Sequence, residues 1–394
     1  MVSSAHRCLP GGGATRGPPA PDGEGSHLVI LRHTDRTVQG LGSARRGALR
    51  VFEDGGVPGL PLDRFRRHVD RVRPGALWPA DAGPLRARVV AGGRSNLTYE
   101  VTDGTRSWIV RRPPLGHVLA TAHDMSREHR VMSALAGTSV PVPRTYLLCE
   151  DPDVLGAPFY VMEMVEGTPY RGADELAPLG AERVAAIAGR MIDTLVDLHR
   201  VDPAEVGLAD FGRPRGFLER QVRRWKKQLD ASRSRDLDGA AELHALLEAN
   251  VPPESAPAIV HGDYRLDNLL VGADDRVAAV LDWEMATLGD PLTDLALLLV
   301  YMKRTAPVPG RAEATRAPGF PSPDEVVARY AERSGRDLSA IGFYVGLACF
   351  KLAVISEGIH YRYLRGQTVG EGFGAIGDAV EPLLRSGIAA IEGA

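Results

Sequence analysis

Residues 261–268 read His-Gly-Asp-Tyr-Arg-Leu-Asp-Asn, and Asp282 follows in the run Val-Ala-Ala-Val-Leu-Asp-Trp-Glu at residues 277–284. The stretch supplies a carboxylate at Asp263, an amide at Asn268 and a second carboxylate at Asp282. Phosphoryl transfer needs one group that orients the attacking hydroxyl and two oxygen donors that hold a divalent cation against the phosphates. The spacing therefore predicts Asp263 as the catalytic base, with Asn268 and Asp282 as ligands of Mg²⁺.

The same residues match the pattern His-x-Asp-x-x-x-x-Asn that is typical of kinase catalytic loops, followed by an aspartate at the end of a short strand. Four polar positions must coincide, and His261, Asp263, Asn268 and Asp282 all do. We expect His261 to be structural, with its ring bonded to the loop, and Asp267 to be exposed. The alternative to a catalytic loop is a turn that is rich in Asx residues and is followed by a strand end, without a catalytic role.

The composition fits a globular protein of one large or two medium domains. The chain has 394 residues, of which 44% are hydrophobic and 25% charged, and a net charge of −3 favours neither a nucleic-acid nor a membrane partner. Three cysteines without CxxC spacing indicate a reducing compartment, so a cytoplasmic location is expected. No apolar stretch approaches the roughly 20 residues of a membrane span, and the longest candidate covers residues 295–302.

The chain divides into three parts. Residues 1–60 are rich in glycine, proline and arginine, and we expect a disordered tail or a start assigned too early. Residues 61–166 are expected to form a strand-rich, nucleotide-binding N-lobe, and residues 167–394 a helical C-lobe with the catalytic loop, the metal site and the acceptor site. Strands before helices indicate an α+β fold, with a hinge across Glu163–Gly167.

Hydrophobic periodicity and turn residues give the expected elements. Strands are expected at residues 85–91, 97–103, 107–112, 145–149 and 159–165. Helices are expected at residues 62–72, 124–136, 181–200, 217–229, 240–249, 290–303, 324–333, 338–364 and 374–391.

A glycine-rich turn lies between two expected strands and reads Gly92-Gly93-Arg94-Ser95-Asn96. Glycines let a backbone approach an anion closely, and successive amides can point at phosphate oxygens. Gly92, Gly93, Ser95 and Asn96 are therefore candidate nucleotide-binding residues. A hairpin turn without a ligand is the alternative.

The expected third strand carries Arg111 and Arg112 at the place where kinases have a lysine that contacts the phosphates. Only four of the 47 basic residues are lysines, and none precedes Lys226. Arg111 is then the phosphate-binding cation, Glu128 on the following helix its partner, and Arg112 faces the other side of the sheet. A surface ion pair at a strand edge is the alternative.

Several other polar residues have two interpretations. Glu284 is either an outer partner of the metal or an exposed acid, on the same face as Asp282 if the strand continues. Asp290 and Asp294 are expected to cap the following apolar helix, and His199 to be packed with its ring satisfied.

The helix at residues 217–229 has a basic side. Its buried residues are expected to be Leu218, Val222, Trp225 and Leu229, which leaves outward Arg220, Arg223, Arg224 and Lys227. This side is either a solvated face or an electropositive wall for an anionic acceptor, and the sequence does not decide between them.

These motifs resemble the aminoglycoside phosphotransferase and choline kinase branch of the protein-kinase-like fold, and more closely the kinase-like domain found with some acyl-CoA dehydrogenases. The shared stretches lie at residues 92–99, 110–114, 122–128, 140–143, 159–163, 261–263 and 281–284. The resemblance covers about residues 62–390. It implies a two-lobed fold with a small antiparallel sheet, and ATP between the lobes with adenine held near Glu163, Met164 and Val165.

Two departures from protein kinases bear on the acceptor. Arginine replaces the strand lysine, and only residues 283–293 separate Asp282 from Asp294, so a peptide-docking activation segment has no room. The chain is therefore expected to be an ATP- and Mg²⁺-dependent phosphotransferase that acts on a hydroxyl of a small molecule, with a hydroxy acid or hydroxyacyl-CoA as first candidate. The alternatives are a nucleotide-binding pseudokinase that regulates a partner, an antibiotic phosphotransferase of the aminoglycoside type, and nucleotidyl transfer.

Overall fold

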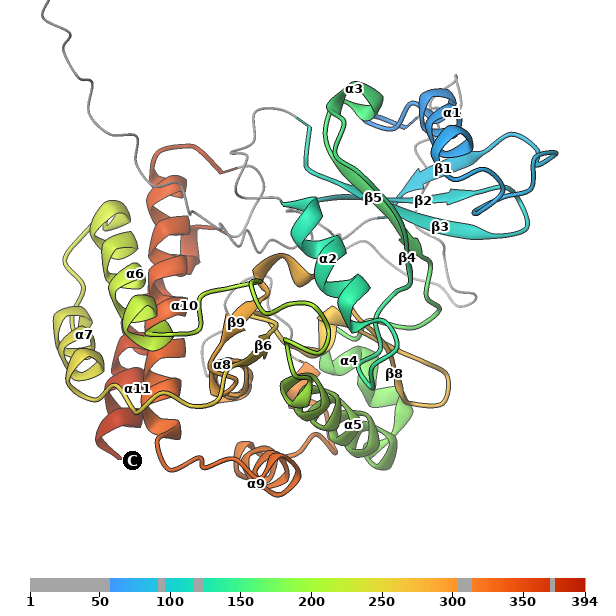
Figure 1. The fold of residues 1–394 in the computed structure, drawn as a ribbon. Helices are drawn as coiled ribbons and strands as arrows, with labels where there is room; N and C mark the ends of the chain where they lie inside the picture. Colours follow the sequence, from blue (N-terminus) through green and yellow to red (C-terminus); the bar gives the residue numbers. More distant parts are fainter. Residues whose placement is uncertain (1–56, 91–95, 116–123, 304–313, 369–372, 394) are drawn as a thin grey trace, which may run out of the picture.

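The computed structural model describes residues 57–90, 96–115, 124–303, 314–368 and 373–393. Figure 1 shows a smaller lobe that contains the main sheet and a larger lobe built mostly from helices. The α+β, two-lobed architecture expected from the sequence is therefore present. The predictions for residues 1–56 and for Gly92, Gly93 and Ser95 lie outside the described residues.

The N-lobe is built around one five-stranded antiparallel sheet with the order β1-β2-β3-β5-β4. Its strands are β1 (Arg86–Val89), β2 (Leu97–Thr102), β3 (Ser107–Arg112), β4 (Thr145–Cys149) and β5 (Phe159–Glu163). Its helices are α1 (Leu62–Val72), α2 (Met125–Leu135) and the single turn α3 (Pro152–Leu155). Val57 and Leu60 are buried and form a short bridge, so the lobe includes residues ahead of the expected boundary at residue 61.

Successive residues of a strand point to opposite faces of the sheet, and β5 shows the consequence. Phe159 and Val161 pack in a cluster with residues of α1, whereas Tyr160 and Met162 pack on the other face in the cluster that continues into the C-lobe. Both faces of the sheet are therefore covered at β5, whereas β1 at the edge of the sheet is mostly exposed. The same alternation places Arg111 and Arg112 on opposite sides of β3.

The linker between the lobes lies against the C-lobe. β5 ends at Glu163, and Thr168 exchanges backbone hydrogen bonds with Val271, of 2.9 and 3.1 Å. A side chain at Gly167 would place its Cβ 2.8 Å from the Cβ of Leu270, so only glycine fits this close approach. The segment that follows Glu163 therefore leads from the sheet of the N-lobe to a close backbone contact with β7 of the C-lobe.

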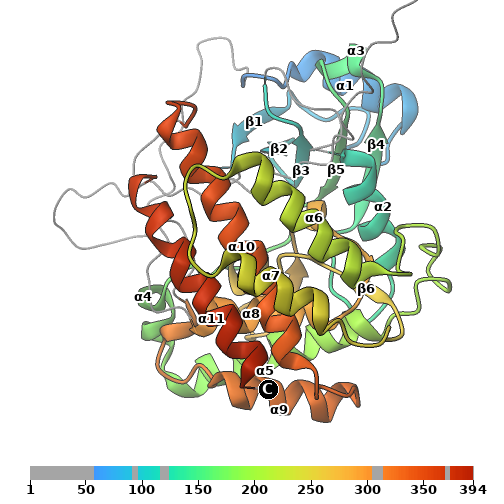
Figure 2. The same ribbon diagram turned by 90° about the vertical axis from the view of Figure 1, so that its left-hand side faces the viewer.

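Helices form most of the C-lobe. They are α4 (Ala173–Leu176), α5 (Ala181–Arg200), α6 (Phe217–Ser232), α7 (Ala240–Ala249), α8 (Leu292–Lys303), α9 (Pro323–Ser334), α10 (Ile341–Leu364) and α11 (Val380–Glu392). Figure 2 shows α10 beside α11, with α6 and α7 packed against this pair. The expected helix at residues 374–391 divides into a 3₁₀ segment, Gly374–Ala379, and α11.

The expectation that every apolar stretch is too short to span a membrane is wrong for α10. Its 24 residues have a mean hydropathy of 1.4 over the most apolar window. In the described protein, 83% of that window is buried against other elements, as in a core helix. Lys351 and Glu357 interrupt its apolar run, so the sequence contains no uninterrupted apolar stretch as long as α10.

Two small antiparallel ladders carry the catalytic loop. β6 (Ala258–Val260) pairs with β9 (Thr287–Gly289), and β7 (Leu269–Val271) pairs with β8 (Val277–Val280). Leu269 lies opposite Val280, and the amide of Leu281 donates to the carbonyl of Asn268 at 2.8 Å. Pairing of β7 with β8 therefore brings Asn268 and Asp282 to the same end of this ladder.

Candidate active site

The catalytic loop is held by a carboxylate from α8. The backbone amides of His261 and Gly262 both donate to Asp294, each at 2.7 Å, and the Asp294 side chain is fully buried. The expectation that Asp294 caps its own helix is wrong, because its side chain reaches across to the loop. Asp290 does cap α8, since its carboxylate accepts from the amide of Leu292 at 3.0 Å.

The two histidines near the loop are structural. His261 Nε2 lies 2.9 Å from the carbonyl oxygen of Leu281, which ties the loop to the segment that carries Asp282. His199 contacts Asp294 through Nε2 at 3.3 Å and Tyr330 through Nδ1 at 2.8 Å. Both side chains are buried, so the expectations for His261 and His199 agree with their positions.

Asp263 is buried at the centre of a polar network. Its Oδ1 accepts from the Tyr301 hydroxyl at 2.8 Å, and its Oδ2 lies 3.3 Å from both Asn268 Nδ2 and Arg265 Nε. Burial would raise the pKa of the Asp263 carboxyl, but the charge of Arg265, the Tyr301 hydrogen bond and the charge of Lys351 together hold the pKa below its ordinary value. Asp263 is therefore ionised at neutral pH and suited to orient a hydroxyl.

Asp267 differs from the expectation of solvent exposure. Its carboxylate lies 3.1 Å from Arg265 Nε, and only 12% of its side chain is exposed. Burial raises the pKa of Asp267, although the charge of Arg265 opposes the shift. Arg265 thus bridges Asp263 and Asp267 from within the loop, and it fixes the position of the base.

Asn268 and Asp282 present oxygens at neighbouring positions. Asn268 Nδ2 donates to the Asp263 carbonyl at 2.9 Å, which leaves its amide oxygen as the atom that could bind a cation. Asp282 has a left-handed backbone with φ of 64°, a conformation that aspartate tolerates better than most residues. The chain then turns into a 3₁₀ segment, Trp283–Met285, so the condition that would place Glu284 on the same strand face as Asp282 is not met.

Arg111 joins the two lobes. It forms an ion pair with Glu128 at 3.1 Å and donates to Asp282 at 2.6 Å. Glu128 is fully buried and also accepts from Asn96 and Tyr160, each at 2.9 Å. The expected pairing of Arg111 with Glu128 is therefore present, and Asp282 is an additional partner.

On the opposite face of β3, Arg112 is buried and structural. It donates to the backbone carbonyls of Gly59 and Leu155, each at 2.7 Å. The prediction that the two arginines face opposite sides is confirmed, and of the two only Arg111 reaches Asp282 of the C-lobe.

The donor set around Asp282 fits Mg²⁺. In the part of the chain that the structure describes, no three His, Cys, Asp or Glu side chains group around a possible metal position. Mg²⁺ needs no such cage, because it keeps several waters and takes one or two protein oxygens besides the phosphates. Burial, followed by the charge of Asp282, raises the pKa of Glu284 to about 8. The carboxylates close to Asp282 create a negative potential that favours the binding of a divalent cation.

Of the expected nucleotide-binding residues, the structure describes Asn96, Arg111, Glu163, Met164 and Val165. Asn96 is buried, and besides Glu128 it donates to Glu284 at 3.4 Å. The Glu163 amide donates to the Arg144 carbonyl at 2.8 Å, so that amide is not available to an adenine. Met164, at 36% exposed, and Val165 follow at the open end of β5.

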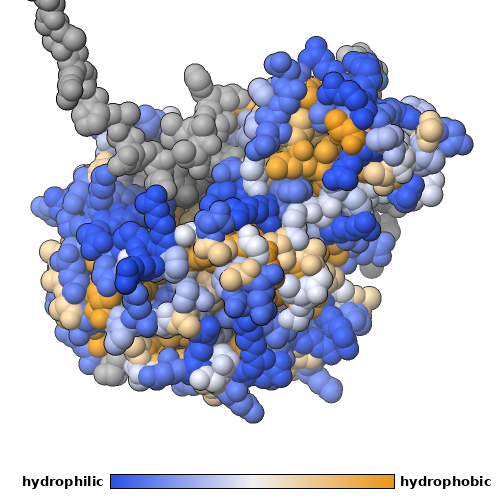
Figure 3. Space-filling model, in the orientation of Figure 1, coloured by the Kyte–Doolittle hydropathy of each residue, from blue (hydrophilic) through white to orange (hydrophobic). Residues whose placement is uncertain are grey.

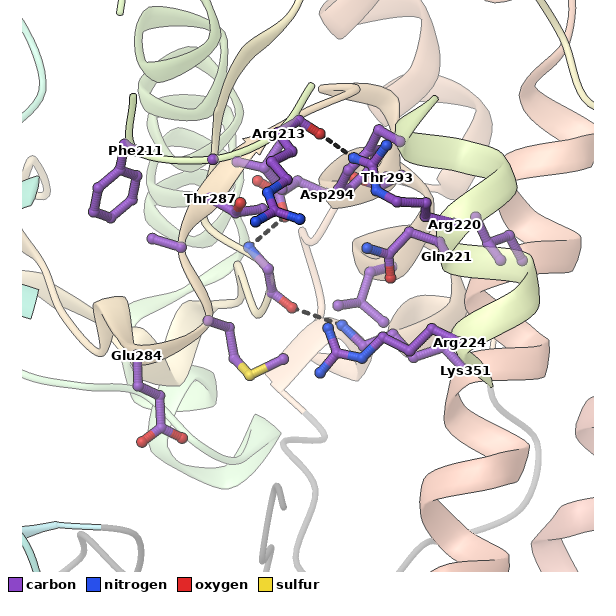
Figure 4. A pocket seen from close by; sticks show the side chains of 18 of the residues that line it. Phe211, Arg213, Arg220, Gln221, Arg224, Glu284, Thr287, Thr293, Asp294 and Lys351 are labelled. Atoms are coloured by element: carbon purple, nitrogen blue, oxygen red, sulfur yellow. Dashed lines mark hydrogen bonds between the residues drawn. The ribbon is translucent and has the colours of Figure 1, made fainter. Parts of the chain in front are cut away.

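An open cavity of about 670 Å³ adjoins the catalytic loop at Gly262. One face of α6 lines it with Phe217, Arg220, Gln221, Arg224 and Trp225, and one face of α10 with Tyr344, Leu347, Ala348 and Lys351. Lys351 Nζ donates to the carbonyl of Gly262 at 2.9 Å. Figure 4 shows Arg224 and Lys351 extending from these two helices into the cavity.

The basic helix therefore has two kinds of cation. Arg220 and Arg224 line the cavity, whereas Arg223 and Lys227 are exposed. Figure 3 shows a mainly hydrophilic surface over α6, which agrees with the second pair. The interpretation as a solvated face holds only for Arg223 and Lys227.

Three residues of the site were missed in the sequence. Arg265 lies inside the quoted loop, and its alternation with Asp263 and Asp267 was a signal that could have identified it. Tyr301 and Lys351 come from α8 and α10, and only the packing of these helices brings them to the loop. Their spacing in the sequence carries no comparable signal.

Comparison with known proteins agrees with this geometry. A sequence model of a protein family, described as the phosphotransferase enzyme family, matches residues 86–334. Acyl-CoA dehydrogenase family member 11 of Gallus gallus is 36% identical over 336 residues, which are 82% of this chain but only 42% of that protein. The human protein of the same name is 35% identical over 302 residues. The chain thus spans about two fifths of the length of these relatives.

Solved structures with the same fold were also found. A candidate aminoglycoside phosphotransferase from Ralstonia eutropha has 31% sequence identity and a TM-score of 0.73, and the match covers 84% of this chain and 98% of that one. Aminoglycoside phosphotransferase APH(4)-Ia in complex with AMP-PNP and hygromycin B has 14% identity and a TM-score of 0.53, with 84% and 99% of the chains covered. At 14% identity the likeness shows the fold alone.

Proposed function

Because the chain belongs to the phosphotransferase enzyme family, we propose that it transfers the γ-phosphate of ATP to a hydroxyl of a small organic acid or of its CoA thioester. The observation that carries the proposal is the meeting of Asp263, Asn268 and Asp282 at one end of the β7–β8 ladder. Such a group of one orienting carboxylate and two oxygen donors serves phosphoryl transfer. The complex of a protein of this fold with AMP-PNP supports ATP as the donor.

Each residue of the loop has a distinct task in this reaction. Asp263, ionised and fixed by Tyr301, Arg265 and Asn268, accepts a hydrogen bond from the acceptor hydroxyl and aligns its oxygen for attack. Asp294 holds the amides of His261 and Gly262, which keeps the loop in that position. Catalysis then depends on positioning and fixed charge, which is consistent with the lowered pKa of Asp263.

On the nucleotide side, Arg111 would contact the phosphates, while Asn268 and Asp282 would hold Mg²⁺. When bound, Mg²⁺ neutralises part of the negative charge of the phosphates. Asn96, Glu163, Met164 and Val165 border the region that the nucleotide would occupy, with Glu128 keeping Arg111 in place through the ion pair.

A small acceptor agrees with the segment after Asp282. It passes through the 3₁₀ turn and β9 and enters α8 at Leu292, so no long peptide-docking segment is present there. The similarity to acyl-CoA dehydrogenase family members supports a hydroxy acid or hydroxyacyl-CoA as the acceptor. Aminoglycosides are polycations, and a cavity lined by arginines suits them poorly.

The free thiols support a cytoplasmic location. Cys149 and Cys349 are buried and form no disulfide in the described structure. This pattern is usual for a reducing compartment. We propose no nucleic-acid or membrane partner for the reaction.

The test is a screen of hydroxy acids, hydroxyacyl-CoA thioesters and neutral alcohols with γ-labelled ATP, read by mass spectrometry for a phosphate on the acceptor. We expect labelled phosphate on at least one acid or thioester. Asp263→Asn should lower turnover by about 10²–10⁴-fold, since it removes the group that orients the hydroxyl. It should leave the affinity for AMP-PNP within twofold. Near-normal turnover of this variant would remove Asp263 from its role.

A further inference from the structure

In the cavity beside the catalytic loop, the acidic side chains have hydrogen-bond or ion-pair partners, whereas two arginines of α6 have no carboxylate partner among the described residues. Its acidic side chains all have partners: Asp124 accepts from the amide of Arg127, Asp210 pairs with Arg130, Glu284 accepts from Asn96, and Asp294 accepts from the loop amides. These carboxylates are therefore poorly placed to attract a cationic ligand.

The arginines of α6 are in the opposite situation. Arg220 donates to the backbone carbonyls of Arg213 and Arg215, which are neutral acceptors. Arg224 Nε is buried and has no hydrogen-bond partner, and its guanidinium lies 5.5 Å from the centre of the Trp225 ring. Among the residues described here, neither arginine forms an ion pair with a carboxylate. A buried guanidinium nitrogen without a partner is costly, and a ligand oxygen would relieve this cost.

The surroundings of Arg224 favour an organic anion. Phe217, Trp225, Leu347 and Ala348 give the cavity an apolar wall on which the carbon chain of a ligand could pack. Lys351 Nζ lies 5.8 Å from the centre of the Trp225 ring. The same ammonium group donates to the carbonyl of Gly262, the residue that precedes Asp263 in the catalytic loop. A ligand bound by Arg224 would therefore have its reactive end close to Asp263.

We propose that Arg224, assisted by Lys351, determines acceptor specificity by binding a carboxylate or phosphate group of the acceptor. The inference rests on the proposed function, because it assigns this cavity to the phosphoryl acceptor. Guanidinium groups bind such anions through two parallel hydrogen bonds, and they remain charged at every physiological pH. The cavity thus selects an anionic alcohol against a neutral alcohol of the same length.

The experiment measures binding without turnover, so that it stays separate from the test of catalysis. The nucleotide site is filled with AMP-PNP and Mg²⁺, and three probes are titrated by calorimetry: 3-hydroxybutyrate, 3-hydroxybutyryl-CoA and butane-1,3-diol. We expect at least one anionic probe to bind at least about tenfold more tightly than the diol. Binding of the acid indicates recognition of a carboxylate, and binding of the thioester alone indicates recognition of the CoA phosphates.

Matched variants separate Arg224 from general surface charge. Arg224→Gln should weaken the anionic probe about tenfold, and Arg224→Lys should recover part of the loss. Arg223→Gln removes the same charge from the adjacent exposed position and should leave the affinity for the anionic probe unchanged. Gln221→Glu keeps Arg224 in place but adds a carboxylate to the same face of α6, and it should also weaken binding.

Three results would overturn the proposal. They are a diol that binds as tightly as the anionic probes, no binding of either anion to the wild-type protein, and equal effects of Arg224→Gln and Arg223→Gln. If phosphoryl transfer fails with every alcohol while the anion still binds through Arg224, the proposed function is wrong but the anion site stands.

Discussion

The arginines on the two sides of the catalytic loop differ in whether a carboxylate of the protein neutralises their charge. On the nucleotide side, Arg111 is held by Glu128 and Asp282, and its charge is compensated within the protein. On the acceptor side, Arg220 and Arg224 contact neutral carbonyls or an aromatic ring. A compensated arginine can be positioned rigidly in the absence of ligand, whereas an uncompensated one gains most when an anion arrives. The comparison predicts opposite consequences when each side is mutated.

Among the variants that compare the two sides, the largest effect is expected for Asp282→Ala on the nucleotide side. The substitution removes a cation ligand and a partner of Arg111, so turnover should fall by about 10²–10³-fold. Calorimetry with AMP-PNP should show weaker binding in the presence of Mg²⁺ and little change without it.

A matched control exists for the unusual backbone of Asp282. Asp275 is the other described non-glycine residue with positive φ, at 63°, and it pairs with Arg183 outside the site. Asp275→Ala places alanine at the same backbone conformation and removes an ion pair outside the site, so it should retain full turnover. Unchanged Mg²⁺-dependent affinity in Asp282→Ala would contradict its assignment as a ligand.

A second contrast concerns stability. Arg111→Met leaves the buried carboxylate of Glu128 without its cation, and the free energy of unfolding should fall by about 3–5 kcal/mol. Arg224→Met breaks no ion pair among the described residues, so its cost should stay below about 1 kcal/mol. Urea denaturation measures both. Equal losses in the two variants would remove the distinction between the two sides.

The smallest effect concerns pH and the support of the loop. Burial lowers the pKa of His199, although its hydrogen bond to Asp294 opposes the shift. The unfolded chain, with an ordinary histidine pKa of 6.5, then binds a proton more readily than the folded protein. His199 therefore adds a positive slope to the free energy of unfolding against pH, and its stabilising contribution should fall as the pH drops below about 6.5. Glu284, whose pKa is raised to about 8, contributes in the opposite direction, because the folded protein holds its proton more readily than the unfolded chain does.

His199→Asn should reduce this slope between pH 7 and 5 without removing it. Burial also lowers the pKa values of His68 and His129, so these residues contribute in the same direction. Urea titrations at several pH values give the slope. A slope that is identical in wild type and variant would show that His199 titrates alike in both states.

Local patterns in the sequence predicted those features that depend on local structure. The alternation of β3 was sufficient to place Arg111 and Arg112 on opposite faces, and β3, β4, α1 and α5 have the expected bounds. The spacing of the catalytic loop was sufficient to predict that Asp263, Asn268 and Asp282 lie together, because Asn268 bonds to Asp263 within the loop and the pairing of β7 with β8 brings Asn268 close to Asp282.

Features that depend on packing between distant elements could not be predicted in this way. Asp294 looks like a helix cap in the sequence, and only the position of α8 beside the loop turns its carboxylate toward the amides of His261 and Gly262. The left-handed turn at Asp282 breaks the strand alternation on which the placement of Glu284 depended. Likewise, the division of the α6 cations between cavity and solvent depends on where α10 packs.

The most direct measurement is a crystal structure of the complex with AMP-PNP and Mn²⁺, in which anomalous scattering locates the cation. We expect one Mn²⁺ in contact with the Asn268 amide oxygen, an Asp282 carboxylate oxygen and the phosphates, with the Asp263 carboxylate facing the terminal phosphate. A cation bound elsewhere, with Asn268 and Asp282 both outside its coordination sphere, would contradict this expectation.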